Sequence, residues 1–161
     1  MPDPLFHIVL LHPEIPNNTG NIGRTAVATG CSLHLVHPLG FDLDEKARRR
    51  AGLDYWQHLQ WHEHANWERF LETESPKRLW LFTTKAEQPH WTADLQRGDY
   101  LVFGRESSGV EPHIHEFVTD RWGTDARLTL PMRPEARSLN LATAVCAVAY
   151  EGLRQTTASV R

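Results

Sequence analysis

The chain has 161 residues, of which 40% are hydrophobic and 23% are charged, and its formal net charge at pH 7 is −3. This length suits one compact domain that buries roughly two-thirds of the surface of its unfolded chain, so folding needs no disulfide staples. The small negative charge argues mildly against bulk affinity for nucleic acid, because binding to phosphates normally requires a basic excess.

The two cysteines, Cys31 and Cys146, lie far apart and lack Cys-x-x-Cys spacing. Neither a disulfide framework nor a zinc ribbon is therefore indicated, and two free thiols suit the reducing environment of the cytoplasm. The apolar run near the N-terminus is too short for a membrane span and lacks the basic lead-in of a secretion signal. We expect a cytoplasmic protein.

The first forty residues have the pattern of a β-α-β unit. Residues 5–11 read as a continuous apolar strand, and the turn formers of PEIPNNTGN supply Asn and Thr as candidate caps for a helix over 21–29. Gly30 is well placed to end this helix in the left-handed conformation, and a second strand over 33–36 stops before Pro38.

The rest of the chain continues the alternation of strands and helices. In order, we expect a basic helix from Asp42 or Asp44 to Arg50, a strand at 56–61, a helix at 65–72, strands at 78–83, 100–103 and 128–130, and a closing helix at 138–155. This pattern indicates one α/β domain over residues 1–155, with a mainly parallel sheet covered by helices on both faces. Residues 156–161 are expected to form a frayed tail.

The closing helix, LNLATAVCAVA, is apolar or small on nearly every side, whereas a helix lying on a sheet has one polar face. Its second face therefore needs cover. A second subunit could supply that cover, since small residues would let two helices approach closely: Ala142, Ala144, Ala147 and Ala149. Burial within a single chain is the alternative, but 161 residues offer little material for it. We expect a homodimer through this helix.

Three segments look unlike scaffold: PEIPNNTGNIGR (13–24), FGRESSGV (103–110) and LPMRPEARSLNLA (130–142). Each follows a predicted strand, and the carboxyl ends of parallel strands share one sheet edge, where ligands bind. We therefore expect the three segments to converge. Neither G-x-G-x-x-G nor G-x-x-x-x-G-K-[ST] occurs, which argues against a Rossmann dehydrogenase, a kinase or a GTPase.

Ten histidines prompt a search for a metal site. The pairs His62/His64 and His113/His115 would each share one face of an extended strand. No third ligand follows at regular spacing, so we expect no bound metal.

The motifs P-x-x-P-x-N-x-G-N-x-x-R, F-G-x-E-x-x-G and R-S-x-N-L-x-x-A occur here in the order in which they occur in the SPOUT methyltransferases. The chain resembles this family over practically its whole length. Within it, the similarity is closest to the small single-domain TrmL (YibK) group, which methylates the ribose 2′-hydroxyl of the tRNA wobble nucleotide.

This resemblance implies a homodimer, S-adenosyl-L-methionine as cofactor, and a C-terminal deep trefoil knot, which generic fold rules call essentially absent. The implied substrate is tRNA, at a wobble cytidine or modified uridine, with leucine tRNAs expected. The implied cofactor contacts are Phe82, Thr83, Gly104, Leu130, Met132 and Ser138. The implied catalytic residues are Arg24, Ser138 and Asn140. The expected substrate contacts are Asn18, Arg48, Arg49, Arg50, Glu106 and Tyr150.

Arg24 is the position that the family treats as catalytic. A guanidinium with a pKa above 12 cannot act as a free base, so we favour its binding the adjacent phosphate and stabilising the developing alkoxide. Asn18 could orient Arg24 and Glu106 could pair with an arginine across the site, although either could instead stabilise a loop. Tyr150 is expected to touch RNA in the second subunit or to be an interface aromatic.

This chain departs from many relatives, with Arg105 where they carry proline and Ser108 where they carry a basic residue. Positive charge thus moves along the loop, and we expect an altered RNA-facing edge. Two alternatives stay open: methylation of another RNA, such as ribosomal RNA, and a catalytically silent RNA-binding module. Retention of Arg24, Ser138 and Asn140 speaks against the silent module. The basic run at 48–50 could also be ordinary solvated surface.

Overall fold

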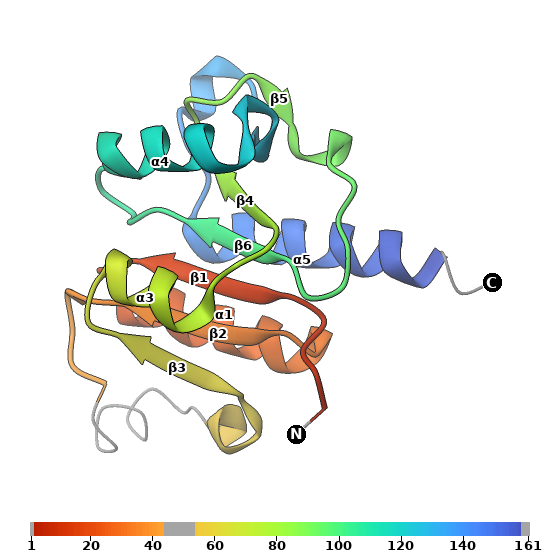
Figure 1. Cartoon of the computed structure of the whole chain (residues 1–161). Coiled ribbons are helices and arrows are strands. Elements are labelled where there is room, and N and C mark those ends of the chain that lie inside the picture. The colour runs from red at the N-terminus through yellow and green to blue at the C-terminus, as the bar shows by residue number, and fades with distance from the viewer. Residues whose placement is uncertain (1, 44–53, 159–161) are drawn as a thin grey trace.

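The computed structural model describes residues 2–43 and 54–158 and contains one seven-stranded sheet (Figure 1). The strands lie in the order β3-β2-β1-β6-β4-β7-β5, and all their pairings are parallel. They are β1 (His7–Leu11), β2 (Ser32–Val36), β3 (Trp61–His64), β4 (Leu79–Phe82), β5 (Gln88–Pro89), β6 (Tyr100–Phe103) and β7 (Arg127–Thr129). The predicted parallel α/β domain is therefore confirmed.

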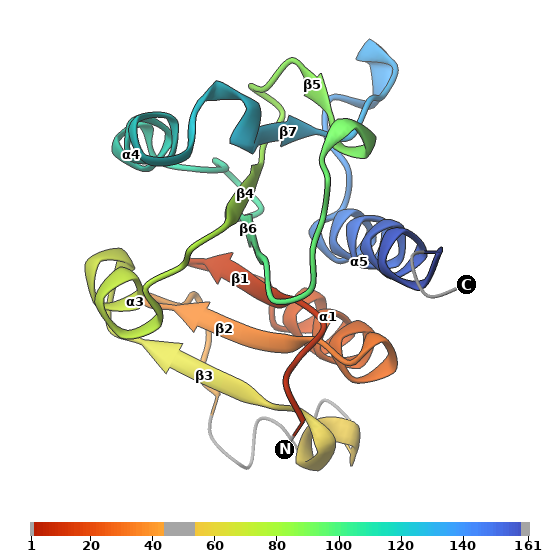
Figure 2. The ribbon, with the colours of Figure 1, turned by 45° about the vertical axis from the view of Figure 1, so that its right-hand side comes forward.

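Helices cover both faces of the sheet, as predicted. The α-helices are α1 (Pro16–Thr29), α3 (Trp67–Glu74), α4 (Pro112–Trp122) and α5 (Leu141–Ala158), and the short 3-10 helices are η1 (Asp54–His58), η2 (His90–Thr92), η3 (Thr124–Ala126) and η4 (Pro134–Ala136). α1 and α5 lie on one face, and α3 and α4 lie on the other (Figures 1 and 2). No described helix is long and apolar enough to cross a membrane.

Strand β1 shows how one run of apolar residues builds two cores. Successive side chains of a strand point to opposite faces. Ile8 and Leu10 pack in the core under α1 and α5, whereas Val9 and Leu11 pack in the core under α3 and α4. None of the four is more than 1% exposed. Burial on both faces explains why the strand lacks the alternating polarity of a half-exposed sheet.

Helix α1 begins earlier than the predicted range of 21–29. Pro16 occupies its first turn, where the missing N–H and the fixed φ of proline are compatible with a helix. The preceding residue, Ile15, makes no side-chain cap, so the expected Asn or Thr cap is wrong. At the other end, Gly30 has φ 77° and caps the helix in the left-handed conformation, as predicted.

The strand predicted over 56–61 is also wrong. Its first half is the 3-10 helix η1, and β3 begins only at Trp61. Trp56 and Leu59 are three residues apart, which is the repeat of a 3-10 helix, and both are buried. They pack on Gly23 of α1, where a Cβ would lie 3.0 Å from the Trp56 ring and 3.3 Å from Leu59. Packing against α1 therefore favours a 3-10 helix over a strand in this segment.

Three further differences concern the helices. Helix α4 was not among the expected elements, although Pro112 at its first turn and Ile114 and Val118, one turn apart and both buried, are helical signals. Helix α5 runs to Ala158, so the tail expected to fray from residue 156 is helical in its first part. The expected basic helix, with Arg48, Arg49 and Arg50, lies largely outside the described residues.

Helix α5 approaches the start of β1 closely at Gly152. A Cβ on this glycine would lie 2.4 Å from Cε2 and 2.7 Å from Cζ of Phe6, and the Phe6 side chain is completely buried. A side chain at position 152 would force this buried ring to shift within the core. Gly152 is therefore required by the contact between the last helix and the first segment of the chain.

We predict that Gly152→Ala destabilises the protein. Replacing glycine by alanine in a helix normally stabilises by about 0.5 to 1 kcal/mol, but overpacking a fixed core costs roughly 1 to 3 kcal/mol, so the clash should dominate. Guanidinium unfolding measures the difference, and Thr157→Ala, an exposed position of the same helix, is the control. A Gly152→Ala protein as stable as wild type would show that Phe6 can yield.

Candidate functional site

A cavity of about 510 Å³ opens where the loops after β4, β6 and β7 meet the start of α5. The three segments singled out from the sequence all contribute to its wall, so their predicted convergence is confirmed. Its lining includes every residue expected to contact the cofactor: Phe82, Thr83, Gly104, Leu130, Met132 and Ser138. Three other expected site residues line it too: Asn18, Glu106 and Asn140.

The loop after β6 is a tight turn that forms one wall of the cavity. Arg105 and Gly109 form an isolated antiparallel bridge, and the Gly109 N–H donates to the Arg105 carbonyl at 3.1 Å. Gly109 has φ 68°, which favours glycine. A Cβ on Gly104 would lie 2.5 Å from the carbonyl carbon of Gly109. Both glycines are therefore needed for the turn itself.

Glu106 links this turn to the N-terminus of α1. Its carboxylate accepts hydrogen bonds from the backbone N–H groups of Glu14 and Ile15, at 2.8 and 3.1 Å, and from the Asn18 amide at 3.4 Å. A carboxylate at a helix N-terminus satisfies free N–H groups and interacts favourably with the helix dipole. Among the described residues no arginine pairs with Glu106, so the expected pairing across the site is wrong.

Two further contacts complete this connection, which we call the loop clamp: Glu14, Asn18, Glu106, Ser107 and Asn140. The Glu14 carboxylate accepts from the backbone N–H and the hydroxyl of Ser107, at 3.0 and 2.7 Å, and these bonds lower the pKa of Glu14. The Asn140 amide donates to the Asn18 side-chain oxygen at 3.1 Å. The clamp thus joins the segments after β1 and β6 to the start of α5.

Asn140 has a second role, because its side-chain oxygen accepts from the Thr143 N–H at 3.2 Å and so caps α5. This cap places the start of α5 at Leu141 rather than at the predicted Ser138. Asn18 bonds to Glu106 and Asn140, and no hydrogen bond to Arg24 is seen in the described structure. The expectation that Asn18 orients Arg24 is therefore not met.

Arg24 is positioned instead by Tyr55 of η1. The guanidinium carbon lies 4.9 Å from the centroid of the Tyr55 ring, within cation–π range, and the Tyr55 hydroxyl donates to the Gly20 carbonyl. Arg24 is exposed on α1 and does not line the cavity. The sequence interpretation missed Tyr55.

Arg105 does not present an unpaired positive charge at the expected RNA-facing edge, and a change in how that edge meets RNA stays a prediction. The Arg105 guanidinium pairs with the Glu111 carboxylate at 2.6 Å, and the Arg105 side chain is only 27% exposed. Glu111 also lies 3.2 Å from His12. The positive charge of Arg105 is therefore paired within the chain. Ser108 is exposed, and Lys85 lines the same cavity.

The remaining expected residues are spread over the molecule. Tyr150 is 48% exposed on α5, away from the cavity lining, and its contact with RNA stays a prediction. The histidines 113 and 115 belong to α4 and, two positions apart in a helix, do not share a face. The described residues instead bring His7, His34 and Glu74 together, with one ligand atom of each within 4.8 Å of the others.

Comparison with known proteins agrees with this architecture. Residues 5–150 match the SpoU rRNA Methylase family. A tRNA (cytidine(34)-2'-O)-methyltransferase of Saccharophagus degradans is 48% identical over 153 residues, which cover 94% of this chain and 96% of the relative. A structure solved to explain 2-OH methylation of C/U34 on tRNA is 43% identical, with a TM-score of 0.82 and 97% of both chains covered.

The fold is shared more widely. The SpoU methyltransferase AviRb from Streptomyces viridochromogenes is 20% identical, with a TM-score of 0.79 over 98% of this chain and 62% of that one. These matches confirm the expected SPOUT α/β knot fold class.

We predict that Glu106→Ala destabilises the chain, because three donors at the start of α1 lose a charged acceptor. Charge-assisted hydrogen bonds of this kind contribute roughly 1 to 3 kcal/mol to stability. Glu106→Gln, which keeps one acceptor oxygen, should lie between alanine and wild type in guanidinium unfolding. Glu116→Ala, at an exposed position of α4, is the control. If all four proteins unfold at one denaturant concentration, the clamp contributes nothing to stability.

Proposed function

The chain belongs to the SpoU methylase family, and from this premise we propose that it transfers a methyl group from S-adenosyl-L-methionine to the ribose 2′-hydroxyl of nucleotide 34 in tRNA. The substrate nucleotide is a cytidine or a modified uridine, with leucine tRNAs the expected species and the cytoplasm the expected location. The observation that carries this proposal is the convergence of the family's three motifs on one cavity, which contains all six expected cofactor contacts.

The cavity suits the cofactor in size and in chemistry. Its volume of about 510 Å³ falls within the range of roughly 300 to 1,000 Å³ found for small-molecule sites. Phe82, Leu130 and Met132 offer an apolar surface to the adenine ring, and neighbouring backbone groups can bind its polar edge. Ser138 and Asn140 add polar side chains to the lining, and these can bind the cofactor carboxylate or the ribose.

When bound, the cofactor supplies an electrophilic methyl group on a sulfonium. The protein must hold the 2′-oxygen in line with this methyl group at about 3 Å, and must help an alcohol of low acidity to lose its proton. The loop clamp fixes the segments that form the cavity and thereby limits how the two reactants can lie. No side chain of the cavity wall is needed as a strong base if the proton passes to a substrate phosphate or to water.

Arg24 acts on the ribose-phosphate side in this proposal. Its planar guanidinium can bind a phosphate with two hydrogen bonds and still present a donor to the developing alkoxide. The Tyr55 ring, 4.9 Å from the guanidinium carbon, limits where the side chain can lie. Retention of Arg24, Ser138 and Asn140 speaks against a catalytically silent RNA-binding module.

We also propose a homodimer through α5. In the single chain, Val145 and Val148 of this helix are buried, whereas Ala147 and Tyr150 are exposed. Leu139, just before the helix and on the cavity wall, is 40% exposed. An apolar face beside the cavity is the kind of surface that a second subunit covers, and a neighbour there could contribute to the RNA site.

Arg24→Ala and Arg24→Lys should both nearly abolish methyl transfer while leaving cofactor affinity within a few-fold of wild type. Removing one preorganised donor typically costs on the order of 3 kcal/mol of barrier, which is a hundredfold or more in rate. Labelled methyl incorporation into tRNA measures turnover, and calorimetric titration with S-adenosyl-L-methionine measures binding. Arg97→Ala, an exposed arginine outside the cavity lining, is the control.

Two outcomes for Arg24 contradict its role as proposed. If Arg24→Lys keeps most of the activity, a single positive charge suffices and bidentate binding is wrong. If Arg24→Ala loses cofactor affinity in proportion to turnover, the residue acts on the cofactor and not on the ribose-phosphate side. Ser138→Ala serves as the opposite reference, since it should weaken cofactor binding as well as turnover.

Ala147→Glu should convert the wild-type dimer to monomer or to insoluble chain, because it places a charge in the middle of the proposed interface. Sedimentation at micromolar concentration measures the mass of the particle. Glu116→Lys, on the opposite face of the sheet, should leave the dimer intact. A wild-type protein that sediments as a monomer at this concentration contradicts the interface.

A further inference from the structure

A cluster of histidines lies on the sheet face that packs against α3, outside the cavity and the loop clamp. His34 of β2 aligns with His62 of β3, and Val36 aligns with His64, so the histidines of neighbouring strands share this face. The His34 ring stacks on those of His62 and His64, with centroids 4.8 and 5.3 Å apart. His7, at the start of β1, meets the same group from the other side.

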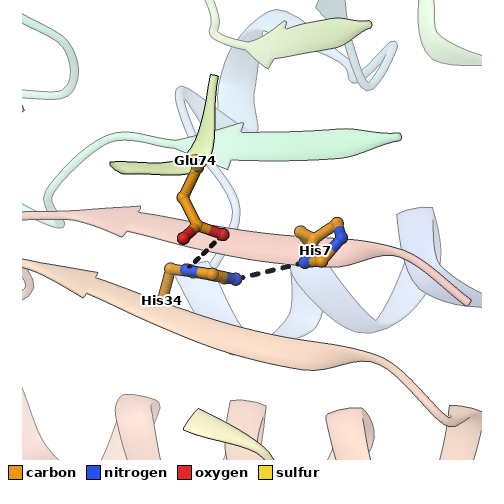
Figure 3. Close-up of side chains that lie close together, drawn as sticks. All are labelled: His7, His34 and Glu74. Atoms are coloured by element: carbon orange, nitrogen blue, oxygen red, sulfur yellow. Dashed lines mark hydrogen bonds and ion pairs between the residues drawn. The ribbon is translucent and has the colours of Figure 1, made fainter. Parts of the chain in front are cut away.

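Figure 3 shows His34 between His7 and Glu74, the last residue of α3. The His7 Nδ1 and His34 Nε2 atoms are 3.2 Å apart, and His34 Nδ1 is 3.7 Å from Glu74 Oε1. These contacts use opposite nitrogens of the His34 ring, and a single ion would bind only one of the two. One ligand atom from each of the three residues lies within 4.8 Å of the other two. Two imidazoles and one carboxylate are a donor set that zinc accepts.

The side chains of His34 and Glu74 are both largely out of contact with water. The His34 side chain is only 1% exposed, so an ion bound to it would be shielded from water. Glu74 is 18% exposed, and its only ion-pair partner among the described residues is His34. No lysine or arginine of the described residues forms an ion pair with its carboxylate.

We propose that His7, His34 and Glu74 bind a divalent transition-metal ion, for which Zn²⁺ best suits the two nitrogen and one oxygen donors. Zinc ligands lie about 2.0 to 2.2 Å from the ion, so the three atoms must close to roughly 3.3 Å of one another. Glu74 can move to do so, since it ends its helix and keeps some exposed surface. The ion would link β1, β2 and α3, which carry the three ligands. Its role would be structural, because His34 is buried and gives a substrate no access to the ion.

The competing arrangement is a metal-free chain of hydrogen bonds. His7 Nδ1 lies 2.7 Å from the Ser32 hydroxyl, and His34 Nδ1 lies 3.0 Å from His64 Nε2. The Tyr100 hydroxyl donates to Glu74 Oε1 at 3.0 Å. If these bonds satisfy the cluster, it gains nothing from a cation. Zinc affinity that depends on Glu74 and His7 would distinguish the metal site from the hydrogen-bonded chain.

The full-length protein, treated with EDTA and dialysed, should be titrated with Zn²⁺ alone by calorimetry. We expect one Zn²⁺ per chain and a rise in the unfolding temperature when the ion is present. Glu74→Gln and His7→Gln should each weaken Zn²⁺ binding by about tenfold or more, as expected when a ligand is lost. Both positions keep some exposed surface, and glutamine at position 74 can still accept from Tyr100, so both variants should fold.

Matched controls separate this site from zinc bound elsewhere. Glu72→Gln lies two residues before Glu74 in α3, where its side chain points away from that of Glu74. His62→Gln removes a histidine from the same sheet face as His34. Both variants should keep wild-type affinity within about twofold. Long-range ¹H–¹⁵N spectra should show Zn²⁺ shifting the ring nitrogens of His7 and His34. No heat of binding at micromolar Zn²⁺ overturns the site. Equal affinity in Glu74→Gln and Glu72→Gln overturns it as well.

Discussion

The cavity depends on the hydrogen bonds that the Glu106 carboxylate accepts at the N-terminus of α1. Glu106 belongs to the turn after β6, whereas its donors, the N–H groups of Glu14 and Ile15, follow β1. β1 and β6 are adjacent in the sheet, although β2 to β5 lie between them in the sequence. One charged acceptor therefore holds two loops that the fold brings close, and Asn18 extends the connection to Asn140 and α5.

The order of the strands explains why chemistry gathers at this edge. β6 lies between β1 and β4, and β7 follows β4, so the loops after these four strands surround one space. Methyl transfer depends mainly on positioning the reactants, because the sulfonium sulfur is already a good leaving group and departs as a neutral thioether. Rigid loops on parallel strands supply that positioning. Arg24 stands apart on α1, held by Tyr55, which fits a residue that meets the RNA and not the cofactor.

Local signals in the sequence predicted what depends on near neighbours. Gly30 ends α1 as expected, and the three motif segments converge because parallel strands share one edge. The predictions were wrong where contacts with residues distant in the sequence determine the local structure. Pro16 begins α1 because Glu106, far along the chain, replaces a local cap, and Trp56 joins a 3-10 helix because it packs on Gly23. The His7 and Glu74 cluster depends on strand register, which spacing along the chain does not reveal.

The proposed reaction can be tested directly with the wild-type protein. Total tRNA from cells that lack this activity should be incubated with the protein and S-adenosyl-L-methionine, digested to nucleosides and examined by mass spectrometry, with isolated anticodon fragments used to locate the product. We expect new 2′-O-methylated cytidine or uridine at nucleotide 34, and none with heat-inactivated protein. The account is contradicted if the protein binds the cofactor yet methylates a base or another nucleotide of tRNA, and leaves the ribose of nucleotide 34 unchanged.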